Sequence, residues 1–410
     1  MNKRLTLVVF LFASALCTSG CWDQIQIEER GFVIGVALDK PKSREAEKSA
    51  EAEAPGRSKG KHRVVATQQF VIPGGITGIG NKGGGASSPD QAFLNLTSEG
   101  DSLLEISRTM ATRTSRSPFY QHMKLIIVSE QIAKTKGLFA DVLDFFLRDP
   151  DSRRSVKVII AKGEAKGVIE VTPKNERLPV MYINSVSENV EKSGRMLPKS
   201  RIGEVHEYLL KSTSFVLPRI TANENEVKVA GAAVFHGADN LMVGYLGEEE
   251  TEGLNFLTGT IKGGMLKIPV HDNMVSFNIR GAKRKISAHI DDKEHIRFDI
   301  MIQCEGNVAE SFERLDFSDS KIVKGIQEKL SREIERMAYD CIEKVQKEMN
   351  TDVLELGRYL NKKHKSFWAQ VKNDWEHGHR YFAKSEIQVH ANVYMRNFGE
   401  VIKSEQIERR

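Results

Sequence analysis

The sequence predicts a mixed α+β protein with three domains after an N-terminal signal segment. Three observations predict this class. Short apolar runs alternate with helical patterns along the first half, and two alternating strand patterns precede one long amphipathic helix near the C-terminus. The 410 residues, 40% of them hydrophobic and 28% charged, leave room for two or three domains. We expect a small sheet with packed helices in each domain, the last with its long helix over a largely antiparallel sheet.

The expected boundaries follow from these patterns. They are a signal peptide at 1–20, an N-terminal α/β domain at 21–200, a small middle domain at 201–265 and a C-terminal domain at 266–410.

The first residues have the composition of a signal peptide. Basic Lys3 and Arg4 precede a mostly apolar run at 5–16. This run is shorter than the ~20 residues that span a ~30 Å hydrocarbon core, and it has the length of a signal-peptide apolar region. No later stretch is long and apolar enough to span a bilayer, so Cys21, which follows this segment, is the only membrane attachment that we expect.

The residues that end this segment resemble a bacterial lipobox. Small residues at 18–20 precede Cys21. We expect the chain to be cleaved just before Cys21 and a lipid to be attached to the Cys21 thiol. The usual pattern has leucine three places earlier, where this chain has Thr18. The alternative is an ordinary secretory signal that ends near a cysteine. A diacylated Cys21 would hold the mature chain on the outer face of a membrane, because two acyl chains anchor stably.

Charge and cysteine content narrow the classes of function. The net charge is +5, and removing Lys3 and Arg4 with the signal leaves +3, with basic and acidic residues mixed throughout. Nucleic-acid binding is therefore not indicated. After processing only Cys21, Cys304 and Cys341 remain, which is too few for a disulfide framework.

The N-terminal domain opens with a predicted strand pair. The continuous apolar run at 31–39 indicates a strand buried on both faces, and 64–72 is its returning partner. Between them, the segment 41–62 is rich in charged and small residues and has no large apolar residue, which is typical of a disordered loop. The Gly-rich loop at 73–89 has the glycine spacing of a P-loop but lacks the Lys-Ser/Thr ending, so we interpret it as a surface loop.

The rest of that domain alternates strands and helices. Ser102 and Glu105 form a capping-box pattern at the start of one helix. The other expected elements are strands at 93–97, 123–128 and 156–161, a helix over 138–146 and amphipathic pieces within 178–210.

Three patterns predict the elements of the later domains: a hairpin, strands with alternating apolar residues, and one long helix with an apolar stripe along its length. Residues 228–246 predict a hairpin, and the acidic run at 247–252 favours a helix start. Strands are expected around 275–279, 298–304 and 387–395, a long helix at 319–349 and a second helix at 353–360. On the long helix Leu330 and Ile334 lie mid-stripe, whereas Glu328 and Glu335 lie off it. We expect alanine at those two glutamates to be near neutral.

An ordered set of segments resembles the C subunit of bacterial spore germinant receptors, the Ger(x)C lipoproteins. Each segment alone is short, but together they cover nearly the whole mature chain. They are GCWD at 20–23, GFVIGVALD at 31–39, HMKLIIVSE at 122–130, RDPDSR at 148–153, GAAVF at 231–235 and LMVGYL at 241–246, followed by Trp368 and Trp375. Thr18, the charged excursion and the Gly-rich loop depart from the family pattern.

The resemblance implies a three-domain mixed α/β lipoprotein on the outer leaflet of the spore's inner membrane. It implies integral-membrane A and B subunits as partners, in a complex that responds to nutrients. The family has no known catalytic residues, so Cys21 is the functional position that carries over. No cofactor is implied.

The chain's own residues give no catalytic motif. Two S-x-x-K matches, at Ser58 and Ser318, lack their companion motifs. The best metal candidates are the histidines at 377, 379 and 390 with Glu376, but no fourth ligand is apparent, so we expect surface or interface histidines and no metal site. We interpret Cys304 and Cys341 as core thiols, with a disulfide between them as the alternative.

Two hypotheses from different classes remain. One is a non-enzymatic scaffold subunit of a receptor complex, and the other is a free-standing lipoprotein that binds a ligand or the cell wall. Co-purification with polytopic membrane subunits separates them.

Overall fold

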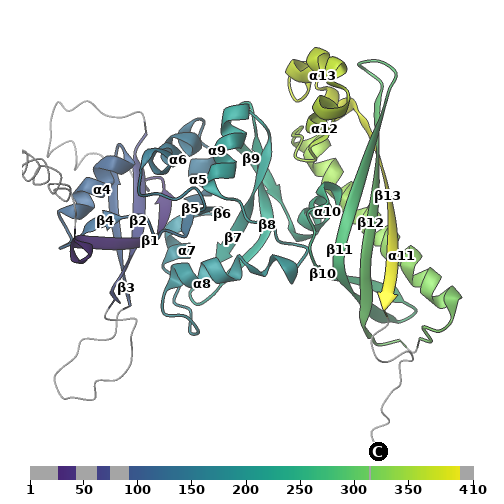
Figure 1. Cartoon of the computed structure of the whole chain (residues 1–410), viewed down its shortest axis with the longest axis horizontal. Helices are drawn as coiled ribbons and strands as arrows, with labels where there is room; N and C mark the ends of the chain where they lie inside the picture. Colours follow the sequence, from purple (N-terminus) through teal and green to yellow (C-terminus); the bar gives the residue numbers. More distant parts are fainter. Residues whose placement is uncertain (1–25, 43–61, 74–91, 314, 398–410) are drawn as a thin grey trace, which may run out of the picture.

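The computed structural model describes residues 26–42, 62–73, 92–313 and 315–397. They form two sheets at opposite ends of an elongated molecule (Figure 1). The first sheet has the order β3-β2-β1-β5-β6-β7-β8-β9, with β4 paired to β1, and the second has the order β10-β11-β12-β13. The predicted α+β class is confirmed.

The first sheet is mixed and centred on β1 (Arg30–Asp39). This strand pairs antiparallel with β2 (Val64–Val71) and parallel with β5 (Leu125–Ser129). The remaining strands are β3 (Phe93–Gly100), β4 (Ser117–Phe119), β6 (Lys157–Ala161), β7 (Phe215–Ala222), β8 (Val227–His236) and β9 (Leu241–Leu246). The predicted opening strand pair is therefore confirmed.

Helices cover both faces of this sheet, which explains why β1 is apolar without alternation. One face carries α4 (Leu103–Ala111), α5 (Glu130–Ala133), α6 (Leu138–Arg148) and α9 (Ile202–Lys211). The other carries α7 (Ala165–Ile169) and α8 (Pro179–Val186). Helix α8 comes so close that a Cβ on Gly35 would lie 2.5 Å from Val180. Short 3₁₀ turns lie at Ile27–Glu29 and Asn189–Glu191.

The second sheet has one face under helices. Its strands are β10 (Gly264–Val270), β11 (Asn273–Ile290), β12 (Ile296–Ser311) and β13 (Glu386–Asn397), and only β13 pairs parallel with its neighbour. The predicted long helix is α11 (Ser320–Ile342), which continues as a π-helix over Glu343–Glu348. Small elements follow: α12 (Leu356–Lys363), α13 (Lys365–Val371), a 3₁₀ turn at Lys372–Asp374 and α14 (Tyr381–Lys384).

Helix α11 packs its predicted stripe into the core and also covers the edge strand β13. Leu330 and Ile334 are fully buried. On a neighbouring row, the side chains of Ser331, Glu335 and Tyr339 accept hydrogen bonds from backbone N–H groups of β13, over 2.8–3.2 Å. This arrangement occupies backbone donors that an open sheet edge would leave unpaired. The expectation that Glu335 is a neutral surface position is therefore wrong.

Helix α10 (Glu248–Thr258) joins the two sheets. Its Leu254 and Phe256 belong to one apolar cluster with Val234 of β8 and Phe298 of β12, so the core is continuous from sheet to sheet. Helices α10 and α11 cross closely, because a Cβ on Gly253 would lie 2.1 Å from a backbone oxygen of α11.

Some boundaries differ from the expectations. The second helix starts at Leu356 rather than 353, because Glu355 adopts a left-handed conformation (φ 64°) just before it. The β8–β9 hairpin extends the nine-stranded sheet instead of forming a sheet of its own. The division at 200 and 265 into three domains stays a prediction. Most of the loops expected at 41–62 and 73–89 lie outside the described residues.

Candidate functional site at the junction of the two sheets

The sequence-predicted site residues fall in different places. Cys21 lies outside the described residues. Among the described residues, we find no helix with the length and apolar character needed to cross a membrane. Of the candidate histidines, His390 is exposed on β13 and His379 stacks on Tyr381 at 5.6 Å between ring centroids. Only His377 meets a further histidine.

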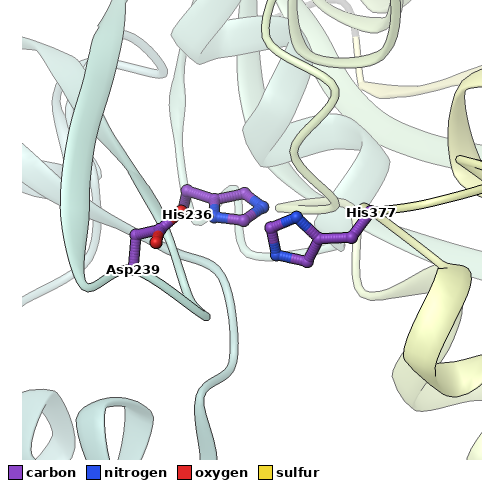
Figure 2. Close-up of side chains that lie close together, drawn as sticks. All are labelled: His236, Asp239 and His377. Atoms are coloured by element: carbon purple, nitrogen blue, oxygen red, sulfur yellow. Dashed lines mark ion pairs between the residues drawn. The ribbon is translucent and has the colours of Figure 1, made fainter.

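His377 lies against His236 at the junction of the two halves (Figure 2). The two imidazole rings are edge to face, with centroids 4.5 Å apart. His236 ends β8, and Asp239 lies in the turn that follows, with its Oδ2 atom 3.3 Å from His236 Nδ1. Lys136 Nζ lies 3.9 Å from the other carboxylate oxygen of Asp239. One possible ligand atom from each of His236, Asp239 and His377 lies within 4.8 Å of the others.

The surroundings of His236 favour its neutral form. Burial lowers its pKa, the nearby His377 lowers it further, and Asp239 acts in the opposite direction. His236 is 7% exposed, whereas Asp239 and His377 are exposed side chains. The cluster thus combines one fixed imidazole with two side chains that have freedom to move.

One buried serine positions the backbone beside both histidines. Ser214 Oγ accepts a hydrogen bond from the Gly237 N–H at 3.0 Å and donates one to Glu376 Oε1 at 2.7 Å. Gly237 follows His236, and Glu376 precedes His377. The turn is tightly packed, because a Cβ on Gly237 would lie 2.3 Å from the backbone carbon of Thr213. Ser214 therefore ties the end of β8 to the segment that carries His377.

Glu376 is bound on its other side by the segment before α12. Its Oε1 accepts from the Asp352 N–H, and its carbonyl oxygen accepts from Asn350 Nδ2, each at 2.5 Å. Burial raises the pKa of Glu376, and hydrogen bonds from Ser214 and Asp352 oppose this. This half-buried carboxylate accepts hydrogen bonds from a backbone N–H and a side-chain O–H, and so it holds the segments of the junction together.

Asp352 completes the network below the junction. Its carboxylate accepts from Gly357 N at 2.6 Å, Leu356 N at 3.1 Å and Trp375 Nε1 at 2.9 Å. These bonds cap α12 and hold the tryptophan that precedes Glu376. Burial, followed by the charge of Glu376, raises the pKa of Asp352 to about 6. The network therefore holds Trp375 and Glu376, the two residues that precede His377, in place.

The two cysteines lie in the core of the second half. Cys304 and Cys341 are buried free thiols. Burial raises the pKa of Cys304 to about 12 and also raises that of Cys341. Neither thiol therefore has the character of a reactive thiolate.

A second candidate surface is the outward face of the four-stranded sheet. Inward residues such as Phe298 and Ile300 pack under the helices, while their neighbours along the strands point outward. The exposed members include Lys283, Lys285, Arg297, Gln303, Glu305, Asn392, Tyr394 and Arg396. We refer to these residues as the open face.

Sequence reasoning missed His236 and Asp239. They sit in a predicted hairpin, but nothing in their spacing points to residue 377 far along the chain. The proximity arises only from the packing of β8 and β9 against the segment before α14.

The fold and the junction define the class of this protein. It is an α+β protein whose two sheets share one core and are also connected by the hydrogen bonds of the junction. Residues 23–222 match the family described as "Spore germination protein N-terminal domain", and residues 230–399 match "Spore germination B3/GerAC like, C-terminal". The chain belongs to this GerAC family of spore germination proteins.

Individual relatives agree over almost the full length. Spore germination protein YndF of Bacillus subtilis (strain 168) is 30% identical over 98% of both chains. Spore germination protein A3 of the same organism is 27% identical over 96% of this chain and 97% of its own, and protein B3 is 25% identical over 97% and 98%. A crystal structure of the GerBC protein superimposes with a TM-score of 0.58 at 20% identity, covering 92% of this chain and 100% of that one. That likeness supports the fold.

Proposed function

We propose that this chain is a lipid-anchored, non-enzymatic subunit of a nutrient germinant receptor complex that triggers spore germination. The observation that carries the proposal is the co-linear match of both halves to the two domains of the GerAC family. In this proposal Cys21 holds the lipid on the outer face of the spore's inner membrane. Integral-membrane A and B subunits are the partners.

The chemistry of the junction supports a structural role. Asp352 is a buried carboxylate and Glu376 a half-buried one, and their oxygens are bonded to backbone N–H groups and to side chains that fix local structure. Groups engaged in this way position neighbouring segments. The chain's contribution to germination is then the placement of surfaces beside its membrane partners.

The anchor is tested by fractionation of cells that make the Cys21→Ala variant without its partner subunits. We expect this variant to leave the membrane fraction after a salt wash, because it has lost its acyl chains. Cys17→Ala is the matched control and should stay with the membrane. Retention of the Cys21→Ala variant would refute lipid anchoring.

The open face is the surface we propose for contact with the membrane subunits. Charge reversal at Lys285 should abolish the nutrient response of spores at unchanged protein level, because a like charge placed in an interface costs binding energy. Lys362→Glu, at an exposed position on α12, is the control and should respond normally. If every response-defective variant of the open face is only under-abundant, and defects cluster instead in a small-molecule pocket, the scaffold proposal fails and direct ligand binding replaces it.

A further inference from the structure

We propose that His236, Asp239 and His377 form a binding site for a divalent transition metal ion, and that zinc is the ion that fits this set. Two imidazole nitrogens and one carboxylate oxygen are common zinc ligands, and three protein ligands leave a fourth position for water. The sequence alone predicted no metal site, because no fourth ligand was apparent beside the candidate histidines, and it gave no sign that His236 and Asp239 lie next to His377.

The distances suit a small tetrahedral ion. Zinc–nitrogen bonds of about 2.0–2.1 Å place neighbouring ligand atoms about 3.3 Å apart. His236 Nδ1 and Asp239 Oδ2 already have a 3.3 Å separation, and all three ligand atoms lie within 4.8 Å of one another. Figure 2 shows one ring nitrogen of His236 toward Asp239 and the other toward His377. Because one ion binds a single nitrogen of a ring, either Asp239 or His377, both exposed, would rotate toward the His236 nitrogen that the other faces.

The hydrogen bonds behind the ligands distinguish this cluster from a chance surface pair. Ser214 bonds to Gly237, next to His236, and to Glu376, next to His377. Glu376 is itself held by the Asp352 N–H. These bonds fix the backbone beside both imidazoles, and supporting hydrogen bonds around the ligands are typical of metal sites.

The neighbouring charges are compatible with a cation. Asp239 supplies a negative charge, and Lys136 is the described cation paired with it, at 3.9 Å from Oδ1. The Lys136 side chain is 83% exposed, so solvent screens this contact and the side chain is free to withdraw. Asp239 Oδ2 faces His236 and stays available to the ion.

A bound ion would link the two halves of the molecule. His236 and Asp239 come from the β8–β9 end of the first sheet, and His377 comes from the segment that leads into α14 and the second sheet. Metal binding would therefore hold the halves at one angle, in addition to their shared core. The proposal does not depend on the receptor function.

The test uses the full-length chain purified in detergent without a histidine tag, stripped of metal and titrated with zinc chloride by calorimetry. We expect saturation at one zinc per chain. His377→Asn should weaken binding by more than about tenfold, because even loss of a group that only orients a ligand costs about 10–100-fold. Asp239→Asn should also lower the affinity for zinc.

His379→Asn is the matched control, an exposed histidine two residues from the ligand, and should bind zinc as the unchanged chain does. Zinc should raise the melting temperature of the unchanged chain and of this control, but not that of His377→Asn. Because His377 is exposed, its variant should melt normally without metal. Absence of one-to-one saturation, or equal zinc affinity in His377→Asn and His379→Asn, would overturn the assignment.

Discussion

At the scale of single residues, burial raises the pKa of several carboxyl groups, among them Glu252 and Asp352. Glu252 on α10 is 2% exposed, and its Oε1 atom has no hydrogen-bond partner among the described residues. Burial raises its pKa to about 7, although Arg195 Nε lies 3.5 Å away and acts in the opposite direction. The folded chain therefore binds a proton here at a pH where the unfolded chain has released it.

This linkage predicts how stability varies with pH. A raised carboxyl pKa makes the free energy of unfolding fall as pH rises from about 4.5 to about 7. Glu252→Gln should remove a fall of roughly 3 kcal/mol, at about 1.4 kcal/mol per pKa unit. Urea unfolding at pH 5 and pH 8 measures it, with Glu328→Gln at an exposed position of α11 as control. Equal pH dependence in Glu252→Gln and the unchanged chain would contradict the assignment.

Asp352 leads to a second prediction at the same scale. Asp352→Asn keeps the size of the side chain but puts an N–H₂ group where a carboxylate oxygen accepts backbone N–H groups or the Trp375 indole. We expect a loss of about 1–3 kcal/mol of unfolding free energy, since a buried donor is left unpaired. Chemical denaturation above pH 7, where Asp352 is ionised, measures it. A loss below 0.5 kcal/mol would show that these bonds contribute little.

At the scale of elements, α11 both fills the core and protects a sheet edge. Leu330→Ala should cost about 2–5 kcal/mol, because Leu330 is fully buried and the cavity cannot collapse completely. Glu328→Ala, exposed on the same helix, is the control and should change stability by less than about 0.5 kcal/mol. Thermal or urea unfolding measures the loss of stability in each variant. Similar losses for Leu330→Ala and Glu328→Ala would mean that another face of α11 is buried.

Glu335 provides the matching test of the edge contacts. Glu335→Ala removes the acceptor for the Ala391 N–H on β13 and should cost about 1–3 kcal/mol. Amide hydrogen exchange should rise at Ala391 before it rises at Phe298 on the central strand β12. Unchanged exchange along β13 would mean that the helix does not protect this edge.

These elements also show how far sequence reasoning reaches. The run at 31–39 predicted a doubly buried strand, and the period of Leu330 and Ile334 predicted a buried helix face, because periodicity reports which face loses water. It does not report which element covers that face. Glu335 was misjudged because its backbone partner lies on β13, and the His236–His377 pair was missed because it depends on how β8 and β9 join the first sheet.

At the scale of the whole molecule, two sheets share one core through α10 and meet again at the Ser214–Glu376 junction. This double connection makes the chain suited to hold surfaces at fixed positions above a membrane, as the proposed scaffold subunit must. In this proposal the lipid on Cys21 keeps the chain near its membrane partners, and the open face selects those partners through direct contacts.

The most direct test of this account is stoichiometric co-purification from spore membranes solubilised in mild detergent. A tagged chain should recover the polytopic A and B subunits at a one-to-one ratio, and the Lys285→Glu variant should recover much less of both at equal abundance. Lys362→Glu should match the unchanged chain. Recovery of the tagged chain alone, from membranes that contain all three proteins, would contradict the central claim.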